Sequence, residues 1–220
     1  VAVVFTATAG VEAGIIVDHQ PHPFGGLGSD TLFPAPGGGQ PVWQQVADDF
    51  VWPTAEPVTQ VNFWGFYNAD NPPVTETMRI RFYSARPTDG LPGDVLKEVV
   101  IQDPNRVWTG RPIAVGILPR EYLFQVPLST PVDLAENENY WLEVVQVGDL
   151  TASFRWEHST TMDFNGVATS NIIHTNWLYT YPGGPADAAF QLISPEPTIT
   201  AIIIIAIFLI GGRRFRRIAA

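Results

Sequence analysis

Two short stretches of the chain show its clearest structural pattern, VNFWGFY at residues 61–67 and MRIRFY at residues 78–83. Apolar and polar side chains alternate in them with a period close to two, as expected for half-buried antiparallel strands. Other short runs rich in valine, isoleucine and aromatic residues recur along the chain, and no window shows an amphipathic helix of ten residues or more. We therefore predict strands at residues 42–50, 58–67, 78–84, 95–101, 122–127, 140–147, 153–157, 177–181 and 188–193.

Turn-forming sequences separate these predicted strands. Proline, glycine, asparagine and aspartate gather at residues 71–73, 89–93, 103–105 and 182–185. Many short strands with a turn signal roughly every ten residues are typical of two packed antiparallel sheets. The predicted fold is all-β, an antiparallel two-sheet sandwich that is jelly-roll-like or immunoglobulin-like, over residues 42–194.

The N-terminal residues give two further predictions. Residues 1–14 (VAVVFTATAGVEAG) are apolar and rich in small side chains, which is typical of the end of a secretory signal peptide. A first strand of the domain is the alternative for this segment. Residues 15–41 end in GGLGSDTLFPAPGGGQP, so we predict a glycine- and proline-rich loop or linker there.

Composition and charge exclude several classes of protein. The 220 residues include no cysteine, which excludes a disulfide scaffold, a thiol nucleophile and a thiolate zinc site. The net charge of −10 argues against nucleic-acid binding, which needs a basic surface. The last 26 residues contain four arginines and one acid, so the rest of the chain has a net charge of −13. A basic tail on an acidic body indicates a membrane or targeting role for the tail.

The tail itself predicts a transmembrane helix. Residues 198–212 contain no charged side chain, and residues 201–210 (AIIIIAIFLI) are wholly apolar. A helix that is apolar on every face is expected in lipid, although fifteen residues at about 1.5 Å each are short for a hydrocarbon layer about 30 Å thick. The positive-inside rule places the preceding domain outside the cytoplasm, because a cluster of cations resists translocation. The residues expected to stop transfer are Arg213, Arg214, Arg216 and Arg217.

Pro195, Glu196 and Pro197, followed by a short apolar helix and an arginine cluster, resemble the PEP-CTERM sorting signal of Gram-negative bacteria. The resemblance implies recognition of this Pro-Glu-Pro motif by an exosortase, a membrane enzyme expected to cut near it and hand the protein to the surface or matrix. Either cleavage or retention as a single-pass helix is compatible with the sequence. The middle of the chain also resembles the ectodomains of PEP-CTERM proteins, in pieces such as ADDF at residues 47–50 and YWL at residues 140–142, which implies a β-sandwich.

Residues that could support chemistry form no recognisable catalytic motif. The chain has no G-x-S-x-G, no H-E-x-x-H and no glycine-rich phosphate loop, so we expect no enzyme. His19 and His22 flank a proline in a predicted loop, which disfavours a metal pair. Asp48 in a predicted strand and Asp70 in a predicted loop are weak candidates for structural calcium, and no other cofactor is expected. A hydrolase remains an alternative, because the distance between two catalytic carboxylates is invisible in sequence.

Seven tryptophans are more than a sandwich core normally uses, so two readings are open: some of them are exposed, or all of them pack in the core or at its rim. Trp64, Trp141 and Trp156 lie inside predicted strands and are expected in the core. Trp108 and Trp177 lie near predicted loops, which makes them candidates for contact with a ligand or a partner.

The sequence therefore predicts a non-enzymatic, exported, membrane-anchored β-sandwich protein that is a surface or matrix component sorted by exosortase. It is expected in the bacterial inner membrane with its main domain in the periplasm, or at the cell surface after sorting. One alternative is an accessory or structural subunit of a larger membrane complex, and another is a carbohydrate-binding module. The expected partners are the lipid bilayer, exosortase or other membrane proteins and, in the last alternative, a polysaccharide, with no nucleic acid.

Overall fold

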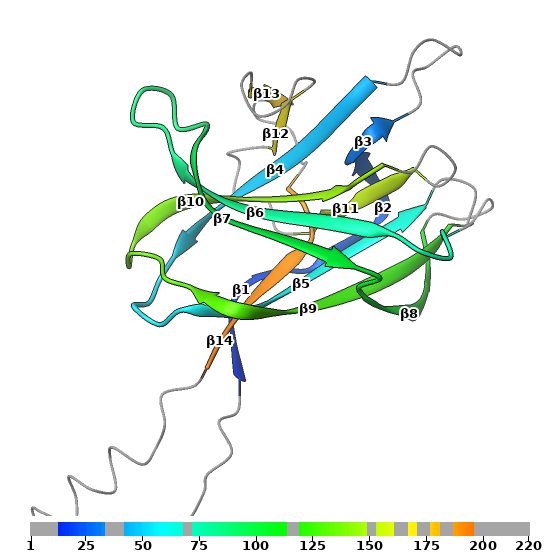
Figure 1. Ribbon diagram of the computed structural model, residues 1–220, viewed down its shortest axis with the longest axis horizontal. Coiled ribbons are helices and arrows are strands. Elements are labelled where there is room, and N and C mark those ends of the chain that lie inside the picture. The colour runs from blue at the N-terminus through cyan, green and yellow to red at the C-terminus, as the bar shows by residue number, and fades with distance from the viewer. Residues whose placement is uncertain are drawn as a thin grey trace, which may run out of the picture. The chain divides into compact units, whose positions relative to one another are not determined.

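The computed structural model describes residues 13–33, 42–67, 72–113, 119–148, 153–160, 167–170, 177–180 and 187–195 (Figure 1). All the regular secondary structure in these ranges is β-strand. Residues Ile15–Ser194 form one compact unit. None of the described residues belongs to a helix long and apolar enough to cross a bilayer. The predicted transmembrane helix at residues 198–212 lies outside the described ranges.

The first of two seven-stranded sheets in the described part of the chain is built around β5 (Val58–Tyr67). One edge of β5 pairs along its length with β9 (Arg120–Val132), which in turn pairs with β8 (Asn105–Pro112). The other edge of β5 is shared by β14 (Phe190–Pro195) and β11 (Phe154–Ser159). The sheet ends beyond these two strands in β1 (Ala13–His19), next to β14, and β2 (Pro21–Gly28), next to β11 (Figure 1).

The second sheet places β10 (Glu138–Gln146) between β4 (Val42–Trp52) and β6 (Thr77–Ala85). Pairing in the described registers is antiparallel except where Gln146 of β10 lies parallel to Asp30. The remaining strands of this sheet are β13 (Leu178–Thr180), β12 (Val167–Ser170), β3 (Asp30–Phe33) and β7 (Pro92–Gln102).

Aromatic rings from both sheets form the core between them. The Phe63 and Phe124 rings stack with centroids 4.6 Å apart, and the Phe154 ring meets both edge-on. The Phe50 ring of the second sheet meets the Phe190 ring of the first at 6.0 Å, also edge-on. Burial of such rings is the main stabilising contribution expected for this fold. Because two sheets pack around this aromatic core, the all-β sandwich prediction is confirmed for the described residues.

Gly65 shows why β5 can lie at the centre of the first sheet. A Cβ atom at this position would lie 2.3 Å from Cε2 of Phe154 and 2.7 Å from the carbonyl oxygen of Arg155. Only glycine therefore allows the Phe154 ring to lie directly against the β5 backbone.

Predicted and observed strands agree best where apolar side chains alternate. All nine predicted strands overlap strands of the structure, and residues 58–67 match β5 at both ends. Five strands were not predicted, namely β1, β2, β3, β8 and β12.

The prediction of a loop or linker at residues 15–41 is wrong for residues 15–33, where β1, β2 and β3 follow one another. The strand β2 was not predicted because it contains Pro21, Pro23 and three glycines, which are typical of loops. Gly26 is required there, because its Cβ would lie 2.3 Å from the carbonyl oxygen of Trp156 on the neighbouring β11. For residues 1–14, the structure describes Ala13 and Gly14 as the beginning of β1, and the predicted signal-peptide remnant lies outside the described ranges.

Candidate functional site

Trp108 on β8 is the outlier among the tryptophans. Its side chain is 57% exposed, which confirms the expectation of exposure. Five other tryptophans whose side chains the structure describes are all below 9% exposed: Trp52, Trp64, Trp141, Trp156 and Trp177. Aromatic rings are enriched at binding surfaces, so we consider β8 first as a candidate site.

The position of β8 explains this exposure. Among the described strands it pairs with β9 alone and so forms an edge of the described sheet, with Trp108 opposite Tyr122. The guanidinium carbon of Arg120, the first residue of β9, lies 5.5 Å from the centroid of the Trp108 ring. A cation at this distance is attracted by the face of the ring and orients it.

A β-bulge follows Trp108 and sets the position of Arg111. The register between β8 and β9 shifts between Trp108 and Pro112, where Gly110 has φ +82°, a conformation that glycine adopts without strain. Arg111 donates to Oε1 of Glu121 from Nε at 2.9 Å, and its Nη2 lies 2.7 Å from the same oxygen. The Glu121 side chain is fully buried, whereas that of Arg111 is 46% exposed. Thus the buried Glu121 carboxylate holds Arg111 in place, while almost half of the Arg111 side chain remains accessible to solvent.

The arginines of the same hairpin are mostly paired. Residues 104–120 contain arginines at positions 106, 111 and 120, of which Arg106 pairs with Glu76 and Arg111 with Glu121. Arg111 and Arg120 were not predicted as site residues. The acid-free stretch was visible in the sequence, but its meaning depends on the β8–β9 pairing, which sequence patterns did not predict.

Glu157 on β11 and Glu121 on β9 form a buried acidic pair on the two strands that flank β5. Both side chains are fully buried. Burial, and then the nearby charge of Glu121, raise the pKa of Glu157 to about 9. Glu157 is therefore protonated at neutral pH, and its burial leaves no access for a substrate.

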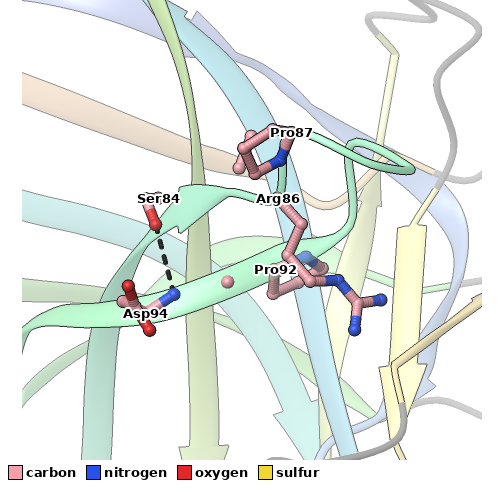
Figure 2. Close-up of a pocket in the computed structure, with 7 residues that line it drawn as sticks. Ser84, Arg86, Pro87, Pro92 and Asp94 are labelled. Atoms are coloured by element: carbon pink, nitrogen blue, oxygen red, sulfur yellow. Dashed lines mark hydrogen bonds between the residues drawn. The ribbon is translucent and has the colours of Figure 1, made fainter.

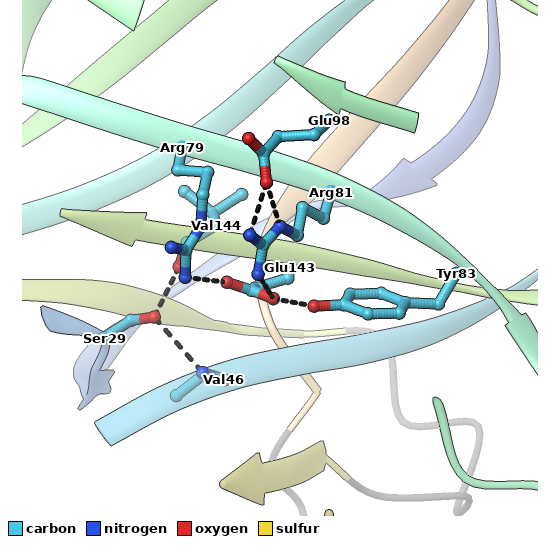
Figure 3. A network of polar contacts seen from close by, with 8 residues as sticks. All are labelled: Ser29, Val46, Arg79, Arg81, Tyr83, Glu98, Glu143 and Val144. Atoms are coloured by element: carbon cyan, nitrogen blue, oxygen red, sulfur yellow. Dashed lines mark hydrogen bonds and ion pairs between the residues drawn. The ribbon is translucent and has the colours of Figure 1, made fainter. Parts of the chain in front are cut away.

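A second buried carboxylate, Glu143 on β10, belongs to a network of charged residues (Figure 3). Arg79 donates to its Oε1 at 2.8 Å, and the hydroxyl of Tyr83 donates to its Oε2. Arg81 lies 3.9 Å from the same Oε2 and also donates to Glu98 on β7 at 2.5 Å. Burial, and then the charge of Glu143, raise the pKa of Tyr83, so that its hydroxyl remains a donor. The network joins β6, β7 and β10 and has a structural role.

A shallow pocket of about 250 Å³ lies at the β6–β7 hairpin (Figure 2). Ser84, Arg86, Pro87 and Asp94 contribute to its walls, and the backbone N–H of Asp94 donates to the Ser84 hydroxyl at 3.1 Å. These contacts hold the hairpin together. None of the residues singled out from the sequence lines this pocket.

Trp177 is 3% exposed, so the expectation that it lies exposed near a loop is wrong. Its ring meets that of Tyr83 edge-on at 5.7 Å, in a small second core with Trp141 and Leu91. Tyr83 is almost a hundred positions earlier in the chain, and no local pattern could predict this contact.

Asp48, a weak calcium candidate, makes contacts that connect strands of the fold. It is 1% exposed, and its Oδ2 accepts a hydrogen bond from the backbone N–H of Ala188 at 3.0 Å. The same oxygen lies 3.3 Å from Nδ1 of His19, which belongs to β1 rather than to the predicted loop. Throughout the described ranges, no group of three or more metal-ligating side chains is placed to hold an ion. Asp70 lies outside those ranges.

The sorting motif is described only at its first residue. Pro195 is the last residue of β14. The rest of the predicted motif and membrane stop lies outside the described residues: Glu196, Pro197, Arg213, Arg214, Arg216 and Arg217.

The family described as a domain of unknown function (DUF7901) matches residues 18–200, which is most of the chain. No curated protein matches the chain.

Proposed function

The chain belongs to the family of a domain of unknown function, DUF7901, and we propose that it is a non-enzymatic, exported β-sandwich protein anchored in the membrane by its C-terminal segment. In this proposal exosortase sorts the protein as a PEP-CTERM substrate, and the sandwich becomes a surface or matrix component. The main domain lies in the periplasm before sorting.

The order of elements in the tail is the observation that supports the proposal. The Pro-Glu-Pro motif, the apolar run of residues 201–210 and the arginine cluster follow one another at the C-terminus. The family match ends at residue 200 and the last described strand ends at Pro195. The apolar run thus follows the end of the family match, as expected for a segment that functions in lipid rather than in the core.

The described acidic residues support a non-enzymatic role. Asp48 accepts a backbone hydrogen bond, Glu143 is neutralised by arginines, and Glu157 is fully buried. Carboxylates that contribute to catalysis have to reach a substrate or its bound water. The first two of these side chains instead join strands of the sandwich.

Cell fractionation combined with intact mass tests the proposal. The full chain is produced in a Gram-negative host with an exosortase and in the same host without it. We expect a product lacking the peptide beyond the Pro-Glu-Pro motif in the first host, and full-length protein in the inner membrane in the second. The double variant P195A/E196A should remain full-length in both, whereas Glu136→Ala, a substitution of an exposed acid, should be processed normally.

Two results separate the proposal from its rivals. Full-length protein in the membrane of both hosts would instead support an accessory subunit of a membrane complex with a permanent helix. Full-length protein in the cytosol would contradict both export and anchoring.

A further inference from the structure

The strand β7 lies at the end of the second sheet and, within the part of the chain that the structure describes, pairs with β6 alone (Figure 1). The backbone N–H of Asp103, just after β7, donates to the carbonyl of Glu76, just before β6, at 2.8 Å. In an antiparallel ladder the backbone groups of alternate residues point to the same neighbour. Three residues of β7 therefore present their N–H and C=O groups at the open edge, namely Glu98, Val100 and Gln102.

Apolar side chains lie along this open edge on both faces of the strand. Val99 and Ile101 face inward and are only partly buried against the core. Val100, on the opposite face, is 54% exposed. Residues 97–102 contain one lysine and one glutamate, so this segment is neutral in a chain of net charge −10. An apolar, neutral and unpaired edge favours pairing with a strand of another chain.

We propose that two copies of this chain pair through β7, antiparallel and about a two-fold axis at Val100. Val100 then lies opposite Val100 of the second copy, and Glu98 lies opposite Gln102 of the second copy. Each of these residue pairs exchanges two backbone hydrogen bonds, so every group at the open edge finds a partner. The dimer goes beyond the proposed function, because it depends on neither export nor anchoring.

Charge complementarity selects this register from those that the open edge allows. In it Lys97 lies opposite Asp103 of the second copy, and the acid Glu98 faces the neutral Gln102. An axis at Glu98 would place two carboxylates opposite each other. An axis at the residue before Val100 would leave Lys97 and Glu98 opposite apolar side chains. An axis at the residue after Val100 would lose a hydrogen bond, because Pro104 has no N–H.

The two ends of the segment limit the pairing to one closed dimer. The register with β6 shifts between Val95 and Lys97, so a bulge ends the straight part of the edge. At the other end Asp103 has φ 47° and turns the chain away. Bulges and inward-facing lysines commonly prevent edge pairing. Here they exclude the registers in which Lys97 meets no acid, and a two-fold contact uses the same edge in both copies and closes.

Cysteine crosslinking tests the contact and its register, because the chain has no cysteine of its own. Single variants of the full chain in detergent micelles are oxidised, and their masses are compared. Val100→Cys should form a covalent dimer, because the Cα atoms of a hydrogen-bonded antiparallel pair are about 5.5 Å apart, within reach of a disulfide. Glu98→Cys and Gln102→Cys should each remain uncrosslinked alone and should crosslink when mixed. Val95→Cys, whose side chain is 46% exposed, is the control, since its two copies would lie about 30 Å apart.

Sedimentation equilibrium of the full chain tests the unmodified dimer. We expect a species of twice 24.2 kDa after correction for bound detergent. Val100→Pro should be monomeric with an unchanged circular dichroism spectrum, because it removes an N–H at the axis that the ladder with β6 does not use. Leu178→Ala, at a side chain that is 67% exposed on β13, should associate like the unchanged chain.

A charge variant tests the register without proline. Lys97→Glu should weaken association about tenfold, because the dimer contains two copies of the pair with Asp103 and like charges opposite each other are unfavourable. Asp103→Asn in the same chain should restore part of the association. Asparagine removes the repulsion and tolerates the positive φ at this position.

The following results would overturn the inference: a monomer at every concentration, equal crosslinking of Val95→Cys and Val100→Cys, or no effect of Lys97→Glu. A dimer that persists in Val100→Pro would instead indicate association through the tail, and masses beyond a dimer would indicate open-ended pairing. None of these measurements depends on sorting, so the proposed function can fail while the dimer stands, and the dimer can fail while sorting stands.

Discussion

At the scale of single residues, Glu157 shows how the sandwich depends on protonation. Its carboxyl is fully buried, near Glu121 and more distantly Arg111, and burial raises its pKa from 4.5 to about 9. Between these two pH values the unfolded chain releases a proton that the folded chain retains. The free energy of unfolding therefore falls as the pH rises from about 4.5 to about 9, by at most about 1.4 kcal/mol per pH unit from this group.

Glu157→Gln should remove this dependence, because an amide stays neutral. We expect the loss of unfolding free energy between pH 5 and pH 8 to be smaller in the variant than in the unchanged protein, by about 4 kcal/mol at most. Urea unfolding at both pH values measures it. The exposed acid Glu138 offers a control, since Glu138→Gln should leave the pH dependence as it is. An identical pH dependence in Glu157→Gln and the unchanged protein would contradict a protonated Glu157.

At the scale of elements, β8 is joined to β5 and to the segment before β6 by one buried cluster. Arg106 donates from Nη1 to Glu76 at 2.5 Å and to the Tyr67 hydroxyl at 3.0 Å. The same guanidinium lies over the rings of Tyr67 and Tyr122. Burial raises the pKa of Tyr67, and its hydroxyl remains protonated and donates to Glu76. This cluster fixes the strand on which Trp108 lies.

Arg106→Ala should destabilise the protein by about 3 kcal/mol, because it leaves the Glu76 carboxylate buried without its cation. Chemical denaturation at pH 7 measures the change. Arg86→Ala is the matched comparison, since the Arg86–Asp89 pair has the same chemistry but side chains that are 33% and 44% exposed. Its effect should be within about 1 kcal/mol. Equal effects of the two variants would show that the buried cluster contributes no more than a surface pair.

The strands that could be predicted are those whose side chains alone determine their structure. Alternation in β6 reflects burial on one face, which is a local property of the sequence, whereas residues 61–67 of β5 are buried on both faces and were predicted from their β-branched and aromatic side chains. In contrast, β2 and β8 contain glycines and prolines that are accommodated by close contacts or a bulge, and these depend on neighbouring strands.

In the candidate site, too, some features follow from the local sequence and others depend on distant strands. Exposure of Trp108 could be predicted from its place near turn residues, but the burial of Trp177 against Tyr83 could not. The contact of Arg120 with Trp108 depends on the register of a strand that was not predicted.

At the scale of the whole molecule, the described core and the motifs of the C-terminal tail occupy different stretches of the sequence. Ile15–Ser194 forms one compact unit, and every described core residue lies within it. The tail beyond Pro195 contains the apolar run and four of the twelve cations of the chain. Stability of the fold and location in the cell should therefore depend on different parts of the sequence.

Deletion of residues 196–220 should move the protein from the membrane to the soluble periplasmic fraction. The unfolding temperature of the sandwich should change by no more than about 2 °C, since no described core contact is lost. Differential scanning calorimetry and fractionation measure the two effects. A large fall in unfolding temperature would mean that the tail is part of the folded core.

The place of β14 within its sheet has a mechanical consequence. β14 lies between β1 and β5, and its last residue, Pro195, is where the proposed tether leaves the domain. Tension on that tether would pull along the strand, perpendicular to the hydrogen bonds on both of its sides. Such a load acts in shear on many bonds at once instead of unzipping them singly, so the domain should resist drag from flowing liquid while its attachment point is held.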